Sequence, residues 1–164
     1  MSLLASIFRE EPSEYVYSLS KSAFLRILAL AAANGVVVWA LAVAFDKLML
    51  TPVFCSEATN IAMCANSTSY SSYIALLVVG ILMVPLLIMF GVKRPLVVVV
   101  AATVVLWGVT LWANGPWTVS ILWTIGVTVL TYLAIIWINR IRGDIAAILL
   151  IVLFVILARV VLLV

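Results

Sequence analysis

Residues 145–164 read IAAILLIVLFVILARVVLLV, and Arg159 is the only charged side chain among these twenty positions. A membrane-spanning α-helix needs about 20 mostly apolar residues to cross a hydrocarbon core of about 30 Å. The segment meets this requirement, so we expect it to form a spanning helix. A transmembrane β-strand would need only about 10 residues of alternating polarity. The unbroken apolar run does not alternate, which argues against a barrel.

Four earlier segments have the same character. The predicted spans are residues 22–48, 73–92, 96–113, 117–138 and 145–164. Short stretches rich in turn-forming residues separate most of them, such as Asn114, Gly115 and Pro116 before the fourth span. The sequence therefore predicts an all-α fold: a polytopic integral membrane protein built as a bundle of about five transmembrane helices.

The composition supports a membrane protein. Hydrophobic residues make up 68% of the chain and charged residues 9%, whereas soluble domains carry about 25% charged residues. A surface that faces water cannot be built from so few charged residues. We therefore expect the chain to contact the lipid bilayer. The net charge of +3 comes without interleaved basic and aromatic residues, so we expect no nucleic-acid partner.

Two regions flank or interrupt the spans. Residues 1–21 form a cytoplasmic N-terminal segment, either a surface amphipathic helix or a frayed terminus. Residues 22–164 form the transmembrane helical domain, which includes the polar stretch 51–72. That stretch is too polar for lipid, where unpaired backbone groups are costly, so we expect an exterior loop.

The basic residues predict the orientation, because short cytoplasmic loops collect Lys and Arg. Seven fall on one side of the five predicted spans, and Lys47 and Arg159 fall on the other. The seven are Arg9, Lys21, Arg26, Lys93, Arg94, Arg140 and Arg142. The N-terminus is therefore predicted to be cytoplasmic, and the loop 51–72 and the C-terminus exterior, in a bacterial or archaeal cell membrane.

Cys55 and Cys64 lie nine positions apart in the predicted exterior loop. We expect a structural disulfide, because an oxidising compartment favours one. A redox-active pair is the alternative, but the spacing is not the Cys-x-x-Cys of redox motifs.

Several polar residues fall inside the predicted spans. Asn34, with Gly35 beside it, indicates either a helix–helix contact or a polar point on a substrate path. Ser120, Thr124 and Thr128 share one helix face, where each hydroxyl can bond the carbonyl four residues back. This stripe indicates a packed face or the lining of a small polar path. Pro85 removes a helical hydrogen bond and predicts a kink.

Arg159 is the most informative charge. It lies fifteen positions after Asp144, hence ~22 Å further along a helix. Its side chain is expected either to extend to the headgroups or to pair with Asp46, which lies at a similar level.

Residue types that carry chemistry are scarce. The chain has no histidine and two cysteines, so it lacks the commonest general base and cannot build a zinc site from these residues. We expect no catalytic site, no metal and no cofactor. The leading interpretation is a non-enzymatic subunit or scaffold of a membrane complex, with other membrane proteins or a second copy as partners. The alternative is a small transporter or channel that acts as an oligomer.

Overall fold

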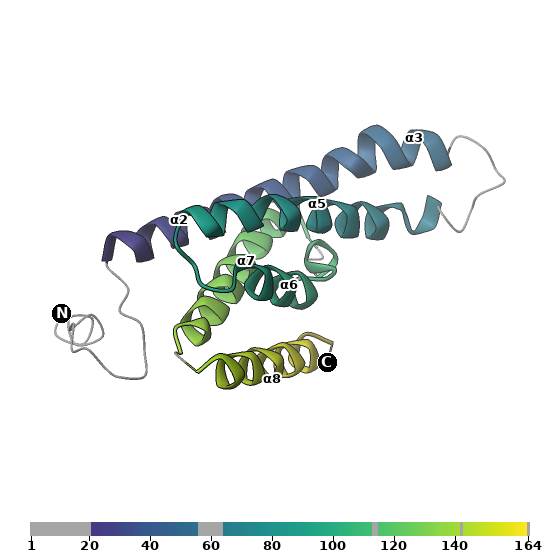
Figure 1. Ribbon diagram of the computed structural model, residues 1–164. Coiled ribbons are helices and arrows are strands. Elements are labelled where there is room, and N and C mark those ends of the chain that lie inside the picture. The colour runs from purple at the N-terminus through teal and green to yellow at the C-terminus, as the bar shows by residue number, and fades with distance from the viewer. Residues whose placement is uncertain (1–20, 56–63, 113–114, 142, 164) are drawn as a thin grey trace.

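The computed structural model describes residues 21–55, 64–112, 115–141 and 143–163. These residues are almost entirely helical (Figure 1). In chain order the elements are α2 (Lys21–Ala44), the π-helix η1 (Phe45–Leu50), α3 (Thr51–Phe54), α5 (Ser67–Met89), α6 (Pro95–Val105), the 3-10 helix η3 (Val109–Leu111), α7 (Trp117–Asn139) and α8 (Asp144–Leu163). The predicted N-terminal segment lies outside the described residues, except for Lys21, which begins α2.

Four helical segments in the described part of the chain are long and apolar enough to cross a membrane. They are Phe24–Phe54, Ser67–Met89, Trp117–Asn139 and Asp144–Val161. A fifth apolar segment, Pro95–Leu111, is shorter. The prediction of an all-α polytopic membrane protein with about five membrane helices is therefore confirmed.

The first two spans are longer than the sequence predicts. Helix continues from Lys21 through η1 and α3 to Phe54, and α5 begins at Ser67. Pro52 lies in the first turn of α3, directly after η1. The polar start of α5 is helical because several of its hydroxyls find partners on neighbouring elements, as described below. Much of the predicted loop 51–72 is thus helix.

Helix α5 ends at a glycine. Gly91 has a φ of 70°, in the left-handed region that favours glycine. Its N–H donates to the Ile88 carbonyl at 2.9 Å, and the Val92 N–H donates to the Leu87 carbonyl at 3.0 Å. These two bonds form a Schellman motif, which satisfies carbonyls that the helix end would leave unpaired.

The predicted span 96–113 is not one continuous helix. Helix α6 covers only the 11 residues Pro95–Val105, a length of ~16 Å, which is about half of a bilayer core. Gly108 has a φ of 85° and breaks the helix before η3. Irregular backbone at this depth needs partners within the protein, and the next subsection identifies one.

Helices α2, α5 and α7 form the centre of the bundle. In Figure 1, α2 and α5 run side by side and α7 crosses them. Helix α6 lies against α5 and α7, and α8 lies beyond α6, farthest from α2 and α5. The buried core includes Val38 from α2, Leu87 from α5, Val98 from α6 and Ile135 from α7. Helix α8 is peripheral: 11% of its spanning window is buried, against 33–39% for the other three spans.

Candidate functional site

Helices α2 and α7 approach each other closely at Gly35. A Cβ atom added to Gly35 would lie 2.8 Å from the Ile125 Cα and 3.3 Å from the Thr128 Cβ. A backbone atom at 2.8 Å leaves no room for any side chain. Gly35 therefore allows the two helices to meet, as small residues do in membrane helix packing.

Polar side chains gather at this contact. Asn34 is 6% exposed, and Thr124, Thr128 and Tyr132 of α7 are buried. The amide of Asn34 hydrogen-bonds the Tyr132 hydroxyl. We call these four residues the α2–α7 polar seam. It joins Asn34 with two members of the predicted hydroxyl stripe and adds Tyr132, which the sequence reasoning missed.

The seam is incompletely hydrogen-bonded. The Thr124 hydroxyl donates to the Ser120 carbonyl at 2.8 Å, the local bond expected for a threonine within a helix. Ser120 itself is only partly buried. Two buried oxygen atoms, Asn34 Oδ1 and Thr128 Oγ1, have no hydrogen-bond partner among the described residues. A buried acceptor without a partner costs free energy, so these two atoms are the strongest sign of a polar function in the seam.

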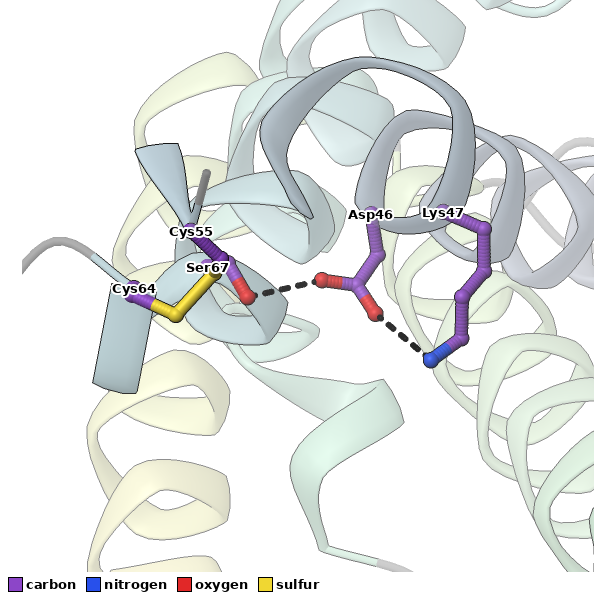
Figure 2. Close-up of a disulfide and its surroundings, with 5 residues drawn as sticks. All are labelled: Asp46, Lys47, Cys55, Cys64 and Ser67. Atoms are coloured by element: carbon purple, nitrogen blue, oxygen red, sulfur yellow. Dashed lines mark hydrogen bonds and ion pairs between the residues drawn. A yellow bond between two sulfur atoms is a disulfide. The ribbon is translucent and has the colours of Figure 1, made fainter. Parts of the chain in front are cut away.

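Asp46 lies at one end of the bundle, close to the disulfide. Figure 2 shows that its carboxylate accepts a hydrogen bond from Ser67 Oγ at 2.9 Å and faces Lys47 Nζ at 3.8 Å. Cys55 and Cys64 are joined by a disulfide, with their Cα atoms 5.1 Å apart. The bridge links the end of α3 to the residues just before α5. It therefore holds together the two helical segments that carry Asp46 and its partner Ser67.

The start of α5 makes further polar contacts at this end. Ser71 Oγ donates to the Thr68 carbonyl at 2.8 Å, and Thr110 Oγ1 donates to Ser72 Oγ at 2.6 Å. Ser71 and Ser72 are buried. The run of Ser and Thr that predicted a loop therefore anchors α5 to its own first turn and to η3.

Arg159 does not pair with Asp46, which contacts Ser67 and Lys47 instead, and its extension toward the headgroups stays a prediction. Its Nη1 donates to the Trp107 carbonyl at 3.0 Å. Trp107 immediately precedes Gly108, so this carbonyl lies where α6 breaks. The Trp107 ring stacks on Tyr73 at 4.7 Å between centroids. Arg159 thus supplies a charged donor to the carbonyl end of α6, where the helix dipole is negative.

The opposite end of the bundle is tied by Arg94. Its guanidinium binds the Asp144 carboxylate and lies 3.5 Å from Asn139 Oδ1. The Asn139 amide in turn donates to the Lys93 carbonyl. Arg94 has a φ of 54°, the one positive φ at a non-glycine residue in the described part of the chain, and such a conformation persists only when its surroundings hold it. These contacts connect the loop before α6 to the loop before α8.

Pro85 lies on the exposed side of α5, and the helix continues through it to Met89. The predicted kink remains a prediction. No group of three or more potential metal-ligating side chains occurs among the described residues. The predicted polar residues therefore lie in three separate places: the seam, the disulfide end and the α6–α8 contact.

No protein-family model, curated protein or solved structure matches this chain. The function is therefore inferred from the geometry of its own residues.

Proposed function

We propose that this chain is a non-enzymatic membrane protein that serves as a subunit or scaffold of a larger membrane complex. The observation that carries the proposal is the peripheral position of α8. Its spanning window is 11% buried, about a third of the value for each of the other spans. Lipid can cover the exposed face of such a helix, and so can a helix of a neighbouring protein. A subunit of a membrane complex needs a face of this kind for lateral packing against its partner.

The exposed face of α8 is large and apolar. Its exposed side chains include Ile145, Leu149, Leu153, Leu157, Val160 and Val161. Positions 145, 149, 153, 157 and 161 are each four residues apart, so they form a continuous ridge along one helix face. Such a ridge suits packing into the groove of another membrane helix.

The absence of catalytic chemistry is part of the proposal. The chain has no histidine, and the seam offers amide and hydroxyl groups rather than an acid–base pair. Its partners on this proposal are the lipid bilayer and other membrane proteins or a second copy, without nucleic acid. The proposed orientation places the N-terminus in the cytoplasm and the disulfide and C-terminus outside a bacterial or archaeal cell membrane. The cluster around Arg94 and Arg140 supports it, because both lie in loops at one end.

The test is extraction of the chain from its native membrane in mild detergent, followed by sizing and mass spectrometry of co-migrating proteins. We expect a defined partner at fixed stoichiometry. Leu149→Trp on α8 should weaken that association. Leu130→Trp on α7 is the matched control, because Leu130 is 68% exposed and Leu149 63% exposed. Equal loss in both variants, or a chain that migrates without any partner, would contradict the proposal.

The orientation has its own test. Alkaline phosphatase fused after Val164 should be active, since this enzyme folds only in an oxidising exterior compartment. A fluorescent protein that matures in the cytoplasm should stay dark at the same position. The opposite pair of signals would reverse the orientation.

Two observations favour the transporter alternative. Asn34 Oδ1 and Thr128 Oγ1 are buried and have no hydrogen-bond partner in the described part of the chain. The apolar segment of α6 is also discontinuous, as helices at transporter binding sites often are. In that case the chain reconstituted without other proteins should alter solute flux across liposomes, and Asn34→Leu should abolish the change. A flux equal to that of empty liposomes would remove this alternative.

A further inference from the structure

Helices α6 and α8 run parallel and are joined at both ends by arginines. At their N-terminal ends, Arg94 binds Asp144. At the other end, Arg159 donates to the carbonyl of Trp107. The first contact joins the two N-terminal ends and the second joins the two C-terminal ends, so the helices point in the same direction and stay side by side along their length.

Between these two ties the helices leave an apolar groove of about 400 Å³. Its lining comes from both helices and includes Leu96, Val100, Ile148, Val152, Val155 and Ile156. Every residue that lines it is apolar. The groove therefore suits a hydrocarbon chain and offers nothing to a polar ligand along its length.

Arg159 lies at one end of this groove. Positions 148, 152, 155 and 159 are spaced by four, three and four residues, so they share one face of α8. Arg159 is therefore one helical turn beyond Val155, on the face that lines the groove.

Arg159 carries a charge that the described residues do not neutralise. The two described carboxylates bind elsewhere: Asp46 contacts Ser67 and Lys47, and Asp144 contacts Arg94. A guanidinium has five N–H donors, and the structure gives one of them an acceptor among the described residues. A cation at this depth is costly without a counter-charge, so an anion at Arg159 would stabilise the site.

We propose that the α6–α8 groove binds one anionic phospholipid, with its acyl chain along the groove and its phosphate on Arg159. The proposal matches an apolar groove to a hydrocarbon tail. It also matches an arginine without a counter-charge in the described part of the chain to a phosphate, which arginine binds through paired hydrogen bonds. Arg159 lies ~22 Å along α8 from Asp144, in the outer third of a bilayer core of about 30 Å, where headgroups can be drawn to the charge by local thinning of the bilayer.

The chemistry of the groove favours a phospholipid over a protein helix as its occupant. Its lining is apolar along its whole length, and a charged arginine lies at one end, which matches a hydrocarbon tail joined to an anionic phosphate. A single acyl chain is much thinner than a helix and can follow the groove between the two helices.

The experiment is native mass spectrometry of the full chain, released from nanodiscs that contain phosphatidylglycerol and phosphatidylcholine in equal amounts. We expect one retained phosphatidylglycerol per chain. Arg159→Gln should weaken its retention about tenfold or more, the effect of losing a charged hydrogen-bond donor. Arg26→Gln is the control for general surface charge, because Arg26 is an exposed arginine on α2 outside the groove.

A second pair of variants tests the groove without touching the arginine. Val152→Trp should fill the groove and reduce lipid retention, whereas Leu153→Trp should not. The two positions are adjacent and 49% and 51% exposed, and Leu153 does not line the groove. This pair keeps the proposal testable if Arg159→Gln destabilises the fold by removing the donor to Trp107.

Three outcomes would overturn the proposal. The first is equal retention in Val152→Trp and Leu153→Trp. The second is displacement of the bound lipid by millimolar inorganic phosphate, which would make Arg159 a site for the free anion. The third is loss of a co-migrating protein in Val152→Trp with unchanged lipid retention, which would make the groove a protein interface.

Discussion

The contact at Gly35 predicts a large difference between two substitutions that look alike in the sequence. Gly35→Ala and Gly126→Ala each add one methyl group to the middle of a spanning helix. At Gly35 the new Cβ would lie 2.8 Å from the Ile125 backbone, whereas at Gly126 it would meet nothing within 4 Å. Gly126 is therefore a matched control on the opposite helix of the same pair.

The magnitude follows from two opposing effects. Replacing glycine with alanine within a helix favours the helix by about 0.8–1 kcal/mol in water, and this gain applies to both variants. Overpacking a tight contact costs about 1–3 kcal/mol, and only Gly35→Ala incurs it, because the Ile125 backbone cannot rotate away. The free energy of unfolding of Gly35→Ala should thus be about 1–3 kcal/mol below that of Gly126→Ala.

The assay is equilibrium unfolding of the purified chain in mixed micelles with increasing denaturing detergent, followed by tryptophan fluorescence. Gly126→Ala should be as stable as the wild type or slightly more stable. Gly35→Ala should unfold at lower denaturant fraction. If the two variants unfold together, α2 and α7 do not approach each other at Gly35 as closely as described.

Three further predictions concern the other sites. Cys55 and Cys64 should resist thiol alkylation until a reductant is added, and labelling without reductant would exclude the bridge. Reduction should lower the free energy of unfolding by about 2–3 kcal/mol, the contribution of a disulfide that closes a short loop. Thr128→Val removes a buried hydroxyl that has no partner among the described residues, so the free energy of unfolding should stay unchanged or rise by up to about 1 kcal/mol. A clear loss of stability in the same unfolding assay would reveal a partner for that hydroxyl. Arg159→Asp should lower the yield of folded protein, and adding Asp46→Arg should not restore it, because Asp46 and Arg159 contact different groups; restoration would show that they pair.

The number and approximate position of the spans follow from the sequence, because the length of an apolar run is set by bilayer thickness. The break in α6 does not. Gly108 lies in a run, VVLWGVTLW, that has no charged residue and one hydroxyl, and glycine is common in continuous membrane helices. Only the packed structure shows that its φ is positive.

The sites were harder to predict than the spans because their partners are distant in sequence. Asn34, Ser120 and Arg159 are recognisable in the sequence because each is a polar residue within an apolar segment. Their contacts are not recognisable: Asn34 contacts Tyr132 on α7, and Arg159 contacts a backbone carbonyl rather than a side chain. A backbone carbonyl has no residue-type signature, so no reading of side chains could have identified it as the partner of Arg159.

The bond from Arg159 to Trp107 also bears on how the chain is made. Ribosomes deliver α6 to the membrane well before α8, so the carbonyl end of α6 enters lipid without the donor that later satisfies it. Until α8 inserts, the nascent bundle holds a polar backbone group without its donor, and such a group is costly in lipid. Insertion of α8 is then the step that completes the hydrogen bonding of the break in α6. A chain stopped at Gly143 should therefore disappear faster in a pulse-chase than the full chain, and equal half-lives would show that α6 matures without help from α8.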